Sequence, residues 1–127
     1  MSVNLNARQP FDQFSRQYFI RRLINEGIRK NKEQLSIIDF GGHKGNTKQA
    51  FPTDDITILD VFDVDYEGYV KGDATNTVFD DNQFDVTTSF DVFEHIPRAK
   101  RKEFIKESAR VSKVGAFLTA PFNQVDR

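Results

Sequence analysis

Short apolar runs separated by polar, turn-forming stretches recur along the chain. Most of these runs are rich in aliphatic and aromatic residues and have the length of strands. Five of them predict strands, at residues 35–40, 56–61, 66–71, 84–90 and 115–120. The cluster Asp80-Asp81-Asn82 before the fourth run is typical of a turn.

Three stretches beside these runs predict helices. Residues 11–30 carry apolar side chains at mostly helical spacing, with arginines between them, and we expect an amphipathic helix there that covers one sheet face. Its apolar positions are Phe11, Phe14, Tyr18, Leu23, Ile24 and Ile28. A short helix is expected at residues 46–51, where Pro52 ends it. A longer helix is expected at residues 98–112, after Pro97.

The alternation of strands and helices predicts an α/β fold. We expect a Rossmann-like, doubly wound, mostly parallel sheet of about five strands with helices on both faces. A chain of 127 residues is long enough for one domain with a buried core. The whole chain, 1–127, is therefore expected to form a single domain, with the N-terminal helix at about 11–30 and the core at 35–122.

The composition excludes several kinds of chemistry. The chain has no cysteine, so it can form no disulfide, thiolate metal site or cysteine nucleophile. With two histidines, a metal site would rest mainly on carboxylates, and we expect no metal. Thirteen phenylalanines and no tryptophan suggest a core filled by phenylalanine.

Charge is balanced over the whole chain but segregated along it. The net charge of −1 gives no global attraction to polyanions, and we expect no nucleic-acid partner. From Asp54 to Glu94, twelve acidic residues oppose one basic residue, Lys71. This acidic stretch would suit a cationic ligand, or it is simply a solvated face.

The hydropathy pattern gives no sign of a membrane segment. No apolar run reaches the roughly 20 residues that a membrane-spanning helix needs. The N-terminus is polar where a signal peptide would be apolar. We therefore expect no membrane contact and a cytoplasmic location.

Acidic and glycine-rich segments follow four of the predicted strands. They are residues 39–45, Asp60, residues 72–74 and residues 89–95. In open α/β sheets the ligand binds beyond the carboxyl ends of the strands, where these segments would meet. A glycine turn after the first strand lets the backbone approach a ligand closely, and a carboxylate after the second can accept both hydroxyls of a ribose. The pattern predicts a nucleoside site.

The glycine turn lacks the spacing of the two common phosphate-binding motifs. A P-loop needs a second glycine followed by lysine and serine or threonine, which is absent here. The dinucleotide fingerprint needs glycines at positions where this chain has His43 and Asn46. A nicotinamide-dependent oxidoreductase is therefore disfavoured.

Two of the segments that follow predicted strands belong to longer motifs. Residues 37–45 read Ile-Ile-Asp-Phe-Gly-Gly-His-Lys-Gly, and residues 91–97 read Asp-Val-Phe-Glu-His-Ile-Pro. The first resembles motif I of class I S-adenosylmethionine-dependent methyltransferases, and the second resembles motif IV of their small-molecule branch. Three further segments continue the resemblance: residues 72–74, 110–113 and 118–121. The resemblance covers about residues 35–122.

The resemblance implies that the chain binds S-adenosylmethionine. Asp60 matches the acid that binds the cofactor's ribose, and Asp73 matches the acid that contacts the adenine amino group. The implied cofactor-binding set is Asp39, Gly41, Gly42, His43, Gly45, Asp60, Val61, Asp73, Ala74 and Asp91. His43 stands where the family has a glycine. Its side chain would crowd the methionine moiety, or point away if Gly42 shifts the turn.

The resemblance also implies methyl transfer, to a small-molecule or glycan-type acceptor. His95 is the candidate general base, because its unperturbed pKa near 6.5 suits proton transfer near neutral pH. The alternative is that His95 and Glu94 only orient the loop. A second possible function is a non-catalytic nucleoside-binding or interaction domain with the same fold.

The family has seven strands, and its last two would lie beyond residue 127. The strand at 115–120 would then form an apolar sheet edge. Such edges recruit partner strands, and we expect a homodimer through 115–120 or coverage of this edge by the N-terminal segment.

Overall fold

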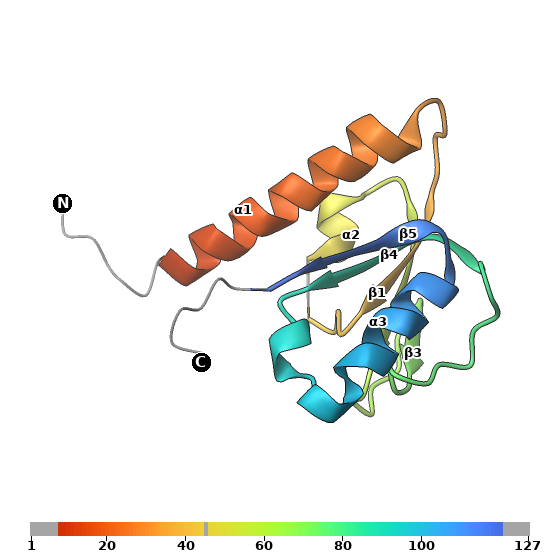
Figure 1. The fold of residues 1–127 in the computed structure, drawn as a ribbon. Helices are drawn as coiled ribbons and strands as arrows, with labels where there is room; N and C mark the ends of the chain where they lie inside the picture. The colour runs from red at the N-terminus through yellow and green to blue at the C-terminus, as the bar shows by residue number, and fades with distance from the viewer. Residues whose placement is uncertain (1–7, 45, 121–127) are drawn as a thin grey trace.

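Five parallel strands form one sheet in the order β3-β2-β1-β4-β5 (Figure 1). The structure is a computed structural model that describes residues 8–44 and 46–120. The strands are β1 (Ser36–Phe40), β2 (Asp55–Asp60), β3 (Tyr69–Lys71), β4 (Phe84–Phe90) and β5 (Ser112–Thr119). This topology confirms the predicted Rossmann-like, doubly wound sheet. β3 begins later than predicted and β5 begins earlier.

Helices cover both faces of the sheet. They are α1 (Arg8–Arg22), the π-helix η2 (Leu23–Arg29) that continues it, α2 (Thr47–Ala50), the 3-10 turns η3 (Phe93–His95) and η4 (Arg98–Lys100), and α3 (Arg101–Arg110). The long red helix α1 and the short α2 lie on one face, and α3 lies on the other (Figure 1). Gly45 and the end of the predicted core at residues 121–122 lie outside the described residues, as do the side chains of Phe11 and Phe14.

Two hydrophobic cores sandwich the sheet, one on each face. Alternate side chains of a strand point to opposite faces, so Ile37 packs into the core under α1 while Ile38 packs into the core under α3. From the helices, Ile20 and Ile24 enter the first core and Phe104 enters the second. Both faces of the central strands are buried, as expected for a parallel sheet.

The predicted apolar face of the first helix is only partly correct. Ile24 is fully buried and Ile28 packs against the first core. Tyr18 and Leu23, by contrast, are 49% and 45% exposed. A partly buried ion pair fixes the end of this helix: Arg29 Nη1 and Nη2 lie 2.8 and 2.5 Å from the carboxylate oxygens of Asp54.

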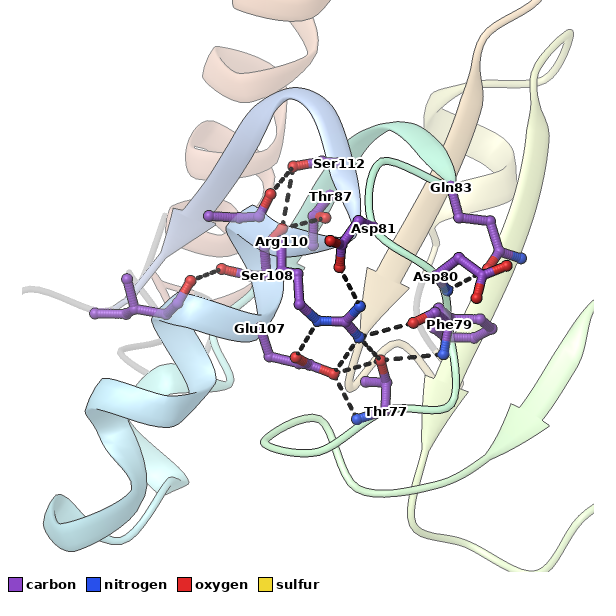
Figure 2. Close-up of polar contacts among 12 residues, drawn as sticks. Thr77, Phe79, Asp80, Asp81, Gln83, Thr87, Glu107, Ser108, Arg110 and Ser112 are labelled. Atoms are coloured by element: carbon purple, nitrogen blue, oxygen red, sulfur yellow. Dashed lines mark hydrogen bonds and ion pairs between the residues drawn. The ribbon is translucent and has the colours of Figure 1, made fainter.

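A polar cluster around Arg110 fixes the loop between β3 and β4 (Figure 2). Its guanidinium donates to Glu107 Oε1 at 2.7 Å, to Asp81 Oδ1 at 2.8 Å and to the Phe79 carbonyl at 2.8 Å. Glu107 in turn accepts a bond of 2.6 Å from the Thr77 backbone N–H. These bonds lower the pKa of Glu107 to about 2, mainly through Arg110. The loop is therefore tied to the last turn of α3.

Candidate functional site

The polar segments that follow the strands lie together along the carboxyl edge of the sheet. β1 and β2 run in register with Phe40 opposite Leu59, so the turn after β1 lies beside Asp60. The β1–β4 pairing places Asp39 opposite Thr88. The Gly72 N–H donates to the Asp60 carbonyl at 2.9 Å, which brings the exit of β3 to the same edge. Of the predicted residues, Asp60, Asp73 and Asp91 thus end or follow strands at this edge, and Asp39 lies one residue before the end of β1.

Asp39 lies inside the protein and supports the glycine turn from below. Its side chain is buried and accepts hydrogen bonds from the Thr47 and Thr88 hydroxyls, the latter at 2.9 Å. Burial disfavours the charged carboxylate and raises the pKa of Asp39 to about 7. Any role of Asp39 toward a ligand therefore acts through the turn.

The two glycines of the turn are required by their surroundings. Gly41 has a φ of +77°, and a Cβ there would lie 2.6 Å from a methyl group of Val92. A Cβ at Gly42 would overlap the Asp39 carboxylate. The turn is held close to β2, because the Gly41 N–H donates to the Leu59 carbonyl at 2.7 Å. Gly45, also predicted to contact the cofactor, lies outside the described residues.

The side chain of His43 points toward the β2–β3 side of the site. Its imidazole packs against the rings of Phe62, Tyr66 and Tyr69, with centroid distances of 5.3, 5.8 and 5.6 Å. Its Nδ1 lies 3.3 Å from the Tyr66 hydroxyl. The ring thus packs against residues that follow β2 and begin β3.

Asp60 ends β2 with a carboxylate held by two backbone N–H groups. His43 N donates to Oδ2 at 3.1 Å, and Val61 N donates to Oδ1 at 2.7 Å. A carboxylate has about four acceptor positions, so about two are left for further donors. Val61 and Phe62 follow directly and are 64% and 54% exposed. A carboxylate with spare acceptor positions beside uncovered apolar side chains fits a ribose and its base.

Asp73 and Ala74 follow β3 in a tight turn. Asp73 Oδ1 accepts bonds from the Thr75 N–H at 2.9 Å and the Thr75 hydroxyl at 2.7 Å. These bonds are the main reason that the pKa of Asp73 is lowered. Ala74 packs against the second core. Asp73 is thus oriented by its own turn, and both bonds go to one of its two oxygens.

Asp91 is engaged by the N-terminal helix. Its carboxylate forms a bidentate ion pair with Arg16, at 2.8 and 2.9 Å. Its backbone has a φ of +60°, and its N–H donates to the Thr119 carbonyl. The sequence pattern predicts an amphipathic helix here and gives no signal for the pairing of Arg16 with Asp91, which lie 75 positions apart.

His95 lies at the surface beside Glu94. The His95 side chain is 78% exposed, and its Nε2 is 3.6 Å from Glu94 Oε1. The other carboxylate oxygen of Glu94 is buried and has no hydrogen-bond partner among the described residues. The position of His95 suits an orienting role at least as well as proton transfer.

A hollow of about 380 Å³ opens on the α2 side of the glycine turn. Its lining includes His43, Lys44, Lys48, Ile58 and Tyr66. None of the acids Asp39, Asp60, Asp73 and Asp91 is among its lining residues, although His43, which lines it, donates its backbone N–H to Asp60.

The described part of the chain offers neither a metal cluster nor a membrane span. No group of three or more histidine and acidic side chains there could hold a metal ion. No described helix combines the length and apolar character needed to cross a bilayer.

Comparison with known proteins identifies the family. The family described as a methyltransferase domain matches residues 46–120, which is more than half of the chain and covers β2 to β5. No curated protein matches significantly.

Solved structures share the fold at low sequence identity. YcgJ from Bacillus subtilis is 19% identical with a TM-score of 0.63, over 79% of this chain and 47% of its own. A structure described as a SAM-dependent methyltransferase from Methanosarcina mazei is 22% identical with a TM-score of 0.53, over 68% and 51%. The chain thus spans about half the length of these structures. With the sheet order, the strand exits and the family match taken together, the chain belongs to the methyltransferase domain family.

Proposed function

We propose that this domain binds S-adenosylmethionine at the carboxyl edge of the sheet and transfers its methyl group to a small-molecule or glycan-type acceptor. The observation that carries the proposal is Asp60, which ends β2 with spare acceptor positions beside the Gly41–Gly42 turn. The family match supports the same cofactor.

The residues at the edge suit different parts of this cofactor. Asp60 would accept the ribose hydroxyls, and the exposed side chains of Val61 and Phe62 would cover the base. Asp73, fixed by its turn, would accept from the adenine amino group. The backbone of the Gly41–Gly42 turn would approach the remainder of the molecule.

The chemistry of the reaction demands little covalent help from the protein. S-adenosylmethionine supplies an electrophilic methyl group on a sulfonium centre. The chain's task is to hold the acceptor in line and to exclude water. A base is needed only if the acceptor must lose a proton, and the exposed His95 with Glu94 beside it is the candidate.

The proposed class of methyl acceptor is inferred from the charge of the chain. The acidic stretch from Asp54 to Glu94 and the net charge of −1 disfavour a polyanionic acceptor such as DNA or RNA. A small or glycan-type acceptor would meet no such repulsion.

A non-catalytic nucleoside-binding domain is the second candidate. Two observations favour it: the Asp91 carboxylate is already paired with Arg16, and the side chain of His95 is mostly exposed. A transfer assay with radiolabelled S-adenosylmethionine and a panel of small acceptors separates the two candidates, since only the enzyme labels an acceptor.

Calorimetric titration tests the binding site itself. We expect Asp60→Ala to weaken binding of S-adenosylhomocysteine at least about tenfold, because the ribose hydroxyls lose a charged acceptor. The matched control is Asp63→Ala, an exposed acid just beyond β2 that should leave the affinity unchanged. NAD should not bind. If Asp60→Ala binds like the wild type, the proposed site is wrong.

A further inference from the structure

The turn after β1 is fixed to the β2–β3 side by an aromatic cluster made of His43, Phe62, Tyr66 and Tyr69. The His43 ring contacts the other three at 5.3 to 5.8 Å and lies nearly parallel to Tyr66, with 26° between the ring planes. Aromatic rings at such centroid distances attract one another beyond the burial of their apolar surface. The cluster therefore joins two loops that follow different strands.

The β2–β3 half of this cluster is itself held in place. Tyr69 belongs to β3, and its hydroxyl donates to the Phe62 carbonyl at 2.6 Å. Tyr66 packs on Tyr69 with a centroid distance of 4.9 Å. The His43 ring thus docks onto a platform anchored in the sheet.

The backbone of the same residue reaches the acid at the end of β2. His43 N donates to Asp60 Oδ2 at 3.1 Å, while Val61 N donates to Oδ1 at 2.7 Å. The first donor comes from the turn after β1 and the second from Asp60's own segment. The orientation of the carboxylate consequently depends on where the turn is held.

The geometry points to His43 as a positioning residue for Asp60. The His43 ring is clamped by Phe62, Tyr66 and Tyr69 and so fixes the turn after β1. In the turn fixed in this way, the His43 backbone N–H orients the Asp60 carboxylate. The side chain acts through its own main chain and does not itself contact a ligand. A glycine or alanine at this position keeps the N–H donor but loses the clamp. Only the consequence for ribose binding rests on the proposed function.

Hydrogen exchange in the ligand-free protein tests the clamp. In His43→Ala, the amide of residue 43 should exchange roughly tenfold faster, because its bond to Asp60 opens more often. His43→Phe keeps a ring in the cluster and should exchange within about threefold of the wild type. The amide of Gly41, which donates to the Leu59 carbonyl, is the internal control and should not change. Unchanged exchange at residue 43 in His43→Ala would overturn the inference.

A ligand comparison tests the effect on Asp60. Wild type should bind adenosine more tightly than 2′,3′-dideoxyadenosine, since only adenosine offers hydroxyls to Asp60. In His43→Ala the ratio of the affinity for adenosine to that for 2′,3′-dideoxyadenosine should fall roughly tenfold, toward the ratio in Asp60→Ala. His43→Phe should keep the wild-type ratio. A general loss of structure would weaken both ligands alike and leave the ratio unchanged, which would contradict the inference. If wild type binds neither nucleoside, the proposed function fails, while the exchange measurement still decides the role of His43.

Discussion

At the scale of single residues, the buried carboxyl group of Asp39 connects the first strand, α2 and β4. Thr47 and Thr88 donate to it from α2 and β4, and its oxygen fills the space that a side chain at position 42 would need. The same carboxyl thus shapes the turn that lies beside Asp60. A buried group of this kind should leave a signature in the pH dependence of stability.

The pKa of Asp39 is raised to about 7 by burial, above the unfolded value of 3.8. The folded protein therefore holds a proton that the unfolded chain releases, and stability falls as the pH rises from about 4 to about 7. Asp39→Asn has no such proton and should lack this slope. Urea unfolding of both proteins at pH 4.5, 6 and 7.5 checks this; we expect the wild type to lose a few kcal/mol relative to the variant. If the free energies of unfolding of the two proteins change in parallel with pH, the raised pKa of Asp39 is contradicted.

At the residue scale, the sequence predicted the positions that depend on local chain geometry. Asp60 at a strand end and Gly41 in a tight turn follow from the order of residues alone. The direction of the His43 ring could not be predicted, because it is decided by aromatic residues that follow another strand. The pairing of Arg16 with Asp91 was missed for the same reason.

At the scale of elements, α3 and the loop before β4 are joined by the Arg110 cluster in Figure 2. Arg110→Ala should destabilise the protein by about 1–3 kcal/mol, because the Phe79 carbonyl loses its donor and Glu107 keeps only the donors of Thr77. Glu107 has a lowered pKa in the folded state. Its contribution to the free energy of unfolding is therefore present above about pH 4.5 and is lost as the pH falls toward 2.

The gap in stability between wild type and Arg110→Ala should therefore shrink on acidification, as measured by urea unfolding at pH 6 and pH 3. Lys102→Ala, an exposed position on the same helix, is the control and should change little. A gap that is equal at both pH values would mean that Arg110 stabilises the loop without acting on Glu107.

The elements themselves were largely predictable. The strand β4 coincides with the predicted run, and all predicted helices exist. The boundaries of β3 and β5 were less accurate, because Tyr66 sits in the aromatic cluster and Ser112 pairs with Phe84 across the sheet. The change from α-helix to π-helix at Leu23 had no sequence signal that we can name.

At the scale of the whole molecule, β5 ends the sheet, and no described strand pairs with its outer edge. We propose that two copies associate through residues 115–120, as unpaired edges favour. Sedimentation should show a concentration-dependent dimer. Val114→Lys, on β5 directly before this segment, should abolish the dimer by placing a charge beside it. Ile105→Lys, a similarly exposed apolar position on α3, should leave the dimer intact. A wild type that is monomeric at all concentrations would overturn the proposal.

The topology was predictable because alternating strands and helices allow few arrangements. The family match begins at residue 46 and thus does not include the glycine turn, so the turn's part in cofactor binding still rests on its geometry and its resemblance to motif I.

The proposed function requires that a nucleoside binds across the carboxyl edge of the sheet. This binding can be followed by titrating S-adenosylhomocysteine into the isotope-labelled chain and recording its backbone chemical shifts. We expect the largest shifts at the amides of Gly41, Val61 and Ala74. Shifts confined to Lys48 and Gln49 in the hollow beside α2, or no shifts at all, would contradict this binding site.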